Sequence, residues 1–540
     1  MTLAAFLEHW SLGENPFRGE EARQDPVFGK LSALPAPAPG DRPFGAIGVP
    51  RPWARVQHPD FEKIAGDFAR PSAAIVFGEK GSGKTAIRLQ LGEHIAAFNA
   101  ANPGRRALLV AMDQLGEVLD RFAARVLPTL REKKATLPDA LTRFRLVDHI
   151  DAVLGQAVPR LVDAVLEQAQ RPAERAATIE AGPEVKRTVR GLDRAMKLDL
   201  LALQAVYDRP EHAEDRARGL RRRLGFRRAW SDAVESLLVG FGWVAPAAVM
   251  AAYVRTGHLR NGLPDLDPIW TTAFFTALGI WLIFLFKRAA GDRLVIGRVA
   301  HRLRKQIRVI ARSERSFAAV LRRLPPGARA PGVLPLSDAE EPRLEMLERL
   351  RRVLGALGYA SIIVVVDRVD EPGLIKGDVD RMRAVVWPLL NNTFLQRDGF
   401  GVKLLLPVEL RHVLLRESSA FFQGARLDKQ CLIERLAWTG AMLYDLCTAR
   451  LNACRPSGAT PITLRDLFAD DVTRQDLIDA LDQMHQPRDA FKLLYQCIAE
   501  HCSNVTADEA SHRIPRAVLD AVRKQQVERV RQLSMGVRPA

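Results

Sequence analysis

A short glycine-rich stretch carries the residue types best suited to chemistry in this chain. Glycines let the backbone curl so that successive N–H groups face one point, and a helix that follows offers its positive N-terminus to a polyphosphate. In the pattern of a glycine, four residues and then Gly-Lys-Thr, Lys84 is expected to reach the β- and γ-phosphates and Thr85 to place its hydroxyl on Mg²⁺. The alternative is an ordinary glycine-rich turn. The residues expected to bind the nucleotide are Gly78, Glu79, Lys80, Gly81, Ser82, Gly83, Lys84, Thr85 and Ala86.

The segments on either side favour the phosphate-binding interpretation. An apolar run at 73–77 precedes the loop and predicts a buried strand. The residues that follow predict an amphipathic helix through Ile87, Leu89, Leu91 and Ile95. A strand before the loop and a helix after it form the context in which this pattern binds phosphate.

A second apolar strand, predicted at 361–366, ends in a group of acids. Asp367 follows it directly and is assigned to the metal, while Asp370 or Glu371 is expected to activate the attacking water. The alternative is an acidic surface turn. We expect this strand to be the direct neighbour of the strand before the loop, so that Lys84 and Asp367 share one magnesium triphosphate.

Several later residues are weaker candidates for the same site. A predicted strand at 402–406 would present the residues after it to the ligand crevice of a parallel sheet. Arginines on polar segments could neutralise the charge of the transferred phosphate, although most such arginines only form surface salt bridges. The candidates are Glu409 and Arg411 after the strand, Arg416 and Arg426 as finger arginines, and Arg488 on a helix that Pro487 begins.

Composition bounds the class of protein. The 540 residues carry a net charge of +16, which suits nucleic acid, anionic lipid or simply an arginine-rich chain. The five cysteines form no CxxC pair, so reduced thiols are expected rather than a metal site or a disulfide framework. Residues 1–10 lack a basic segment and a cleavage site, so no signal peptide is expected.

Two uncharged segments, 236–254 and 268–286, predict a transmembrane hairpin. Each is close to the roughly 20 apolar residues that cross a bilayer core. The alternative is a buried helical hairpin in a soluble domain. Basic residues flank the pair and place both flanks in the cytoplasm by the positive-inside rule: Arg221, Arg222, Arg223, Arg227 and Arg228 before it, Lys287 and Arg288 after it.

A basic helical face follows the second segment. So close to a membrane it favours anionic headgroups, with nucleic acid binding or a merely solvated face as alternatives. Its residues are Arg293, Arg298, Arg302, Arg304, Lys305, Arg308 and Arg312.

These signals predict an α/β fold with a parallel sheet, a large helical insertion and a C-terminal helical lid. The N-terminal arm could pack over an adenine ring or serve as a strap over the core. The predicted parts are the arm (1–60), the first half of the core (61–114), a helical insertion (115–229), the membrane hairpin (230–288), a basic helical segment and linker (289–355), the second half of the core (356–432) and the lid with C-terminal helices (433–540).

Together these motifs resemble the AAA+/STAND branch of P-loop NTPases. Membrane helices between the phosphate loop and the acidic strand resemble the KAP family, whose acidic motif usually has two adjacent acids where this chain has Asp367 and Arg368. The stretch from Arg426 to Lys429 also resembles bacterial ATPases of the origin-recognition type, and Arg488 matches the sensor-two position of both groups.

The resemblance implies an ATPase that uses ATP and Mg²⁺. It implies a switch or assembly ATPase at the inner membrane, with the NTPase and both termini cytoplasmic. The expected partners are membrane lipid, further copies of the chain and an unidentified protein, with nucleic acid less favoured. Two other functions stay open, a soluble DNA-associated ATPase and a nucleotide-dependent scaffold that does not hydrolyse.

Overall fold

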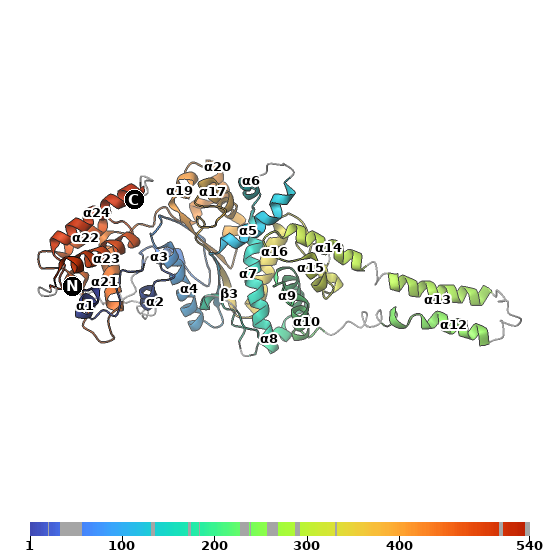
Figure 1. Ribbon diagram of the computed structural model, residues 1–540. Helices are drawn as coiled ribbons and strands as arrows, with labels where there is room; N and C mark the ends of the chain where they lie inside the picture. Colours follow the sequence, from blue (N-terminus) through green and yellow to red (C-terminus); the bar gives the residue numbers. More distant parts are fainter. Residues whose placement is uncertain are drawn as a thin grey trace. The chain divides into compact units, whose positions relative to one another are not determined.

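The chain folds into two compact units in the computed structural model (Figure 1). The core unit comprises Met1–Glu117, Pro172–Ala177 and Ala360–Ala540, and the inserted unit comprises Val118–Arg171 and Thr178–Tyr359. The chain therefore leaves the core unit twice and returns to it in between for one short segment. The structure describes residues 1–19, 21–32, 57–130, 136–170, 174–182, 184–226, 237, 239–255, 268–286, 292–329, 332–506 and 511–534.

A five-stranded parallel sheet organises the core unit, and its spatial order is β2-β3-β4-β1-β5. Its strands are almost wholly buried and rich in Val, Ile and Leu, as expected when helices cover both faces of a parallel sheet. The α/β class predicted from the sequence is confirmed. The strands are β1 (Ala74–Gly78), β2 (Arg106–Met112), β3 (Tyr359–Val366), β4 (Phe400–Pro407) and β5 (Cys431–Ile433).

The strand order corrects one prediction. Ala74 on β1 lies opposite Lys403 on β4, and Val366 on β3 lies opposite Leu404 on β4. β4 thus lies between β1 and β3, and the prediction that these two strands are direct neighbours is wrong. β4 follows both of them in the chain, so chain order gave no sign of its central place. Since the strands are parallel, the residues after β1 and β3 still reach the same edge.

β5 lies at the sheet edge beside β1 and was not predicted. It pairs Cys431, Leu432 and Ile433 with Ala74, Ile75 and Val76. Three residues are too few to give a period-2 signal, so only the pairing with β1 defines this strand.

Helices of the core unit surround the sheet and form the C-terminal part of the chain. The predicted helix after the glycine-rich stretch is α4, and the predicted helix begun by Pro487 is α23. The helices are α1 (Leu3–His9), α2 (Pro26–Ser32), α3 (Phe61–Ala65), α4 (Lys84–Ala101), η2 (Arg175–Ala177), α17 (Val379–Val386), η5 (Trp387–Leu389), α18 (Asn392–Leu395), α19 (Val408–Leu414), α20 (Ser419–Ala425), η6 (Leu427–Lys429), α21 (Gly440–Ala453), η7 (Leu464–Leu467), α22 (Arg474–Asp482), α23 (Pro487–Asn504) and α24 (Arg516–Ser534).

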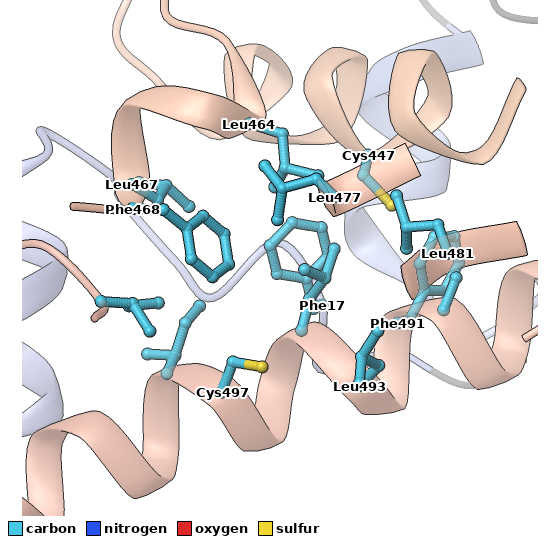
Figure 2. Packing of buried hydrophobic residues seen from close by; sticks show 14 of the residues in the cluster. Phe17, Cys447, Leu464, Leu467, Phe468, Leu477, Leu481, Phe491, Leu493 and Cys497 are labelled. Atoms are coloured by element: carbon cyan, nitrogen blue, oxygen red, sulfur yellow. The ribbon is translucent and has the colours of Figure 1, made fainter. Parts of the chain in front are cut away.

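The N-terminal segment packs into the C-terminal helices. Figure 2 shows Phe17 among side chains of this cluster, including Leu477, Phe491 and Cys497. Phe6, Leu12 and Val27 belong to the same cluster and are buried. The described part of the arm is therefore built into the hydrophobic core of the helices that follow β5. Residues 33–56, the rest of the predicted arm apart from the last few, lie outside the described residues.

The inserted unit is helical, and α7 at its centre is buried along most of its length. A buried ionic network joins its helices: the Tyr207 hydroxyl donates to Asp151 at 2.8 Å, and Arg343 pairs with the same carboxylate at 3.3 Å. The helices are α5 (Leu115–Val126), which begins in the core unit, η1 (Leu127–Thr129), α6 (Leu137–Leu141), α7 (Leu146–Leu166), α8 (Val185–Gly191), α9 (Arg194–Tyr207), α10 (Ala213–Arg223), α12 (Val244–Arg255), α13 (Pro268–Phe286), α14 (Asp292–Gln306), α15 (Glu314–Leu321), η4 (Pro326–Arg329) and α16 (Glu341–Ala356).

Among the described residues, α13 is the one helix long and apolar enough to cross a membrane. It covers the predicted segment 268–286, and none of its residues is buried. α12 is shorter than the predicted first span. The two helices lie side by side (Figure 1), and Trp281 Nε1 donates to the Val239 carbonyl at 3.2 Å. Residues 256–267 between the two helices and the basic flanking residues Arg227, Arg228, Lys287 and Arg288 lie outside the described residues.

Candidate functional site

The glycine-rich stretch forms a tight turn between β1 and α4. Gly81 has φ +103° and Gly83 has φ +94°, backbone conformations that residues other than glycine adopt only with strain. Gly83 is the N-cap of α4, so the positive end of that helix faces the inside of the turn. A Cβ atom on Gly78 would lie 2.4 Å from Ser82 Oγ, which explains the glycine at the end of β1.

Lys84 lies folded back over this turn. Its Nζ donates to the carbonyl oxygens of Gly78 at 2.7 Å and Glu79 at 2.9 Å. Burial lowers the pKa of Lys84, and the carboxylates of Asp367 and Asp370 act against that shift. The ammonium is thus held near the carboxyl edge of the sheet by carbonyls that a stronger acceptor can replace.

Asp367 is the carboxylate that meets the turn from the end of β3. Only 1% of it is exposed, and its Oδ2 accepts a hydrogen bond from Thr85 Oγ1 at 3.0 Å. Its Oδ1 accepts from the Arg368 backbone N–H at 2.9 Å. Burial raises the pKa of Asp367, while Thr85 and nearby Arg88 and Lys84 favour the ionised form. Residues far apart in the chain therefore meet, although β4 separates their strands.

Arg368 lies among the acids that follow β3 and forms an ion pair with Glu371. It has φ +60°, and its Nε lies 2.6 Å from Glu371 Oε2. Its Nη2 donates to Glu21 Oε1 of the N-terminal segment at 2.9 Å. Asp370 and Glu371 both line the cavity beside Lys84. Of the two predicted water-activating acids, Glu371 is engaged by an arginine on its own turn.

A cavity of about 320 Å³ opens beside the turn, within the core unit. Its polar lining includes Lys80, Lys84, Thr85, Asp367 and Arg488, and Ala86 also contributes to it. Its apolar lining comes from the N-terminal segment and the C-terminal helices: Ala22, Phe28, Leu31, Leu446 and Phe491.

Trp438 closes the turn from the segment after β5. Its Nε1 donates to the Ser82 carbonyl at 2.8 Å, and its ring meets His58 edge-on with ring centroids 5.0 Å apart. The buried Ser82 hydroxyl has no hydrogen-bond partner among the described residues. A buried donor without a partner next to a left-handed turn fits a polar ligand held inside the turn.

The remaining candidates divide into those at the cavity and those away from it. Arg488 lies against Gly81, where its Cβ would be 3.0 Å from a Cβ on that glycine. Glu409 is exposed, yet its charge acts on Lys84.

The other candidates point away from the cavity or lie outside it. Glu79 forms an ion pair with Arg435 at 2.7 Å. Arg411 pairs with Glu434 at 2.6 Å, and Arg416 and Arg426 are exposed and do not line the cavity.

Sequence reasoning missed a group of charges behind Asp367 that surrounds a buried arginine. Arg88 on α4 is 2% exposed and contacts the carboxylates of Asp113 and Glu174, and its Nε lies 3.9 Å from Asp367 Oδ2. Arg23 of the N-terminal segment pairs with Asp113 as well. Arg88 follows Lys84 by one helical turn, a signal that was present in the sequence, whereas nothing in the sequence marked Glu174.

The site suits a metal ion only together with a ligand. Among the described residues, no set of three or more His, Cys, Asp or Glu side chains is placed to hold a metal. One carboxylate and one hydroxyl are the protein ligands that Mg²⁺ uses when phosphate oxygens and water complete its shell. Thr85 and Asp367 therefore fit magnesium bound with a phosphate.

No family model, curated protein or solved structure matches the chain. What the site does has to be argued from its own residues.

Proposed function

We propose that the core unit binds a magnesium nucleoside triphosphate at the carboxyl edge of its sheet and hydrolyses it. The observation that carries this proposal is the 3.0 Å hydrogen bond between Thr85 Oγ1 and Asp367 Oδ2 beside the half-buried Lys84 ammonium. A hydroxyl, a carboxylate and an ammonium at a helix N-terminus are the groups that hold a triphosphate with its metal.

Each residue has a distinct role in this proposal. Lys84 exchanges the carbonyls of Gly78 and Glu79 for β- and γ-phosphate oxygens, and the N–H groups at the start of α4 bind the same phosphates. Thr85 and Asp367 hold Mg²⁺, which supplies charge neutralisation on the phosphate oxygens. Arg488 adds positive charge from α23.

Hydrolysis needs a group that orients the attacking water, and here carboxylates are placed to do so. Asp370 or Glu371 accepts a water proton as the water oxygen bonds to the γ-phosphorus and the bond to the β–γ bridging oxygen breaks. The products are the diphosphate and inorganic phosphate. Glu371 must leave Arg368 to serve, whereas Asp370 has no such ion pair among the described contacts.

ATP is the expected nucleotide. The apolar part of the cavity gives a base a place to pack between Phe28, Leu31 and Phe491. The chain carries no Asn-Lys-x-Asp guanine signature. The resemblance to AAA+/STAND proteins points the same way.

We further propose that the protein is anchored in the inner membrane by a hairpin of α12 and α13. The support is α13, with no charged residue and no buried residue, and the pairing of Trp281 with Val239. The NTPase then lies on the cytoplasmic face as a nucleotide-driven switch or assembly ATPase. Fractionation tests this part: the protein should resist a high-salt wash and leave membranes only with detergent.

ATP hydrolysis by the purified full chain in detergent tests the central proposal. Wild type, Lys84→Ala and Asp367→Ala are compared at saturating Mg²⁺. Turnover in the wild type alone supports an ATPase. Binding without turnover leaves the scaffold function, and equal activity in all three overturns the assignment of the site.

The net charge of +16 favours a second candidate, a DNA-associated ATPase. It predicts DNA binding by the purified chain that weakens steeply as salt is added. Absence of such binding at low salt removes it.

A further inference from the structure

The charges behind Asp367 form a chain of contacts that begins at Glu174. The Glu174 carboxylate accepts from Arg88 Nη1 in an ion pair, and the same nitrogen lies 3.5 Å from Asp113 Oδ2. On its other side the Arg88 guanidinium places Nε 3.9 Å from Asp367 Oδ2. That Nε has no hydrogen-bond partner among the described residues. Arg88 is therefore held by Glu174, and its guanidinium lies close to Asp367, the proposed Mg²⁺ ligand, without forming a hydrogen bond to it.

Glu174 comes from the segment in which the chain returns to the core unit. Pro172–Ala177 lies between two stretches of the inserted unit in the sequence. Ala176 of this segment is buried in the core cluster of the sheet, together with Ile87, Leu91 and Ile95 of α4. This packing anchors the segment beside the helix that carries Arg88.

Gly92 on α4 leaves the space that Glu174 fills. A Cβ atom at Gly92 would lie 2.7 Å from Glu174 Oε2. The glycine thus admits the carboxylate to Arg88, and a methyl group there would displace it without altering any charge.

We propose that Glu174 is a positioning residue that keeps Arg88 away from Asp367 and so sets the affinity of the site for Mg²⁺. A guanidinium released from Glu174 still faces two carboxylates, Asp113 at 3.5 Å and Asp367 at 3.9 Å. Asp113 is already paired with Arg23, and at Asp367 the guanidinium competes with the metal. This inference rests on the proposed function, because it assigns Asp367 to magnesium.

The position of Glu174 in the chain gives the proposal a consequence. Both ends of its short segment continue into the inserted unit, which carries α12 and α13. A pull on that segment would act on Arg88, and through Arg88 on the metal carboxylate.

Mg²⁺ titration of nucleotide binding tests the proposal in the full chain. Binding of a fluorescent ATP analogue is measured against Mg²⁺ concentration for wild type, Glu174→Gln, Arg88→Gln and the double variant. We expect Glu174→Gln to raise the half-saturating Mg²⁺ concentration by roughly tenfold, the size of effect seen when partners of metal ligands are lost. Arg88→Gln removes the competitor, so the double variant should return towards the wild-type value.

A merely structural role predicts a different pattern, because the two losses would then add in the double variant. Gly92→Ala gives a second route to the same displacement and should shift the Mg²⁺ dependence in the direction of Glu174→Gln; it decides the matter if Glu174→Gln does not fold. Arg175→Gln, at the exposed neighbouring position, is the matched control and should leave the Mg²⁺ dependence unchanged.

The outcomes separate this inference from the proposed function. Mg²⁺-dependent binding by the wild type with an unchanged half-saturation in Glu174→Gln and Gly92→Ala overturns the inference alone. Absence of Mg²⁺-dependent binding in the wild type overturns the proposed function and the inference together.

Discussion

Two lysines, one at the carboxyl edge of the sheet and one within it, differ in what surrounds them. Lys84 follows β1 at the carboxyl edge, where two carbonyls accept from it and carboxylates of Asp367 and Asp370 lie near. Lys403 lies within β4, fully buried, and its Nζ has no hydrogen-bond partner among the described residues. Burial lowers the pKa of both side chains.

The surroundings of the two lysines indicate which of them is placed to meet a ligand. Around Lys84, a hydroxyl, carboxylates and a helix N-terminus converge on the wall of a cavity. At Lys403, burial outweighs the opposing effect of the Cys431 thiol and lowers the pKa. Burial alone therefore does not identify a site, whereas convergence of complementary groups does.

The largest expected effect is on hydrolysis by Lys84→Met. The substitution keeps the length of the side chain and removes the positive charge from the proposed phosphate site. We expect the turnover rate to fall by roughly 10²-fold or more, as for loss of other groups that stabilise a transition-state charge. Steady-state ATPase assays of the purified variant measure the turnover rate. A rate within a few-fold of the wild type would show that Lys84, like Lys403, takes no part in the reaction.

Asp367→Asn should come next, with function and stability moving in opposite directions. The amide keeps the size of the side chain and removes the charge that would hold Mg²⁺, so Mg²⁺-dependent turnover should be lost. Burial raises the pKa of Asp367. Above the folded pKa of this carboxyl, its ionised form therefore lowers the free energy of unfolding, and a neutral amide removes that loss. Chemical denaturation at pH 7 should show a variant at least as stable as the wild type, and a severe loss of stability would contradict this.

Lys403→Met should stabilise the core unit at neutral pH. Burial lowers the pKa of Lys403 from 10.5 to about 8, so between these values the unfolded chain binds more protons and stability rises with pH. Below pH 8 the buried ammonium lowers the free energy of unfolding by its full amount. The difference between the unfolded and folded pKa of Lys403 corresponds to about 3 kcal/mol at most.

The difference in unfolding free energy between Lys403→Met and wild type measures this prediction. It should be largest near pH 7 and shrink as the pH rises from 8 towards 10.5. A difference that stays constant over that range would show that the folded chain does not lower the pKa of Lys403, so that its ammonium is solvated there.

The smallest effects concern the finger candidates. Arg488 lines the cavity and its charge acts on Lys84, whereas Arg426 is exposed and caps α20 in a left-handed conformation with φ 48°. We expect Arg488→Ala to reduce ATPase activity by roughly tenfold or more and Arg426→Ala to leave it nearly unchanged in the isolated chain. A loss with Arg426→Ala that grows with protein concentration would instead assign it to a neighbouring copy.

The parts of this molecule with local signals were predictable from sequence. The strand, turn and helix around Lys84 are continuous in the chain, and β3 and β4 are dense apolar runs, so their places were predicted to within a few residues. α13 has an unbroken apolar sequence and matches its predicted range.

The rest depended on contacts between distant segments. β4 inserts between β1 and β3, and β5 has only three residues, so neither the order nor the edge strand had a local signal. The contact of Glu174 with Arg88 joins residues from separate parts of the chain, and the pairing of Arg368 with Glu21 does the same. α12 is short because glycines and a proline at 240, 242 and 246 weaken an otherwise apolar segment.

Stabilisation by magnesium ATP measures whether the turn around Lys84 binds the nucleotide. Thermal unfolding is followed with and without Mg²⁺ and ATP for wild type, Lys84→Met and Lys403→Met, two variants that make the same chemical change in the same unit. A ligand at about 100 times its Kd stabilises by about 2.7 kcal/mol. We expect a Mg²⁺-dependent rise in Tm for the wild type and Lys403→Met and none for Lys84→Met. An equal rise in all three would show that Lys84 takes no part in binding the nucleotide.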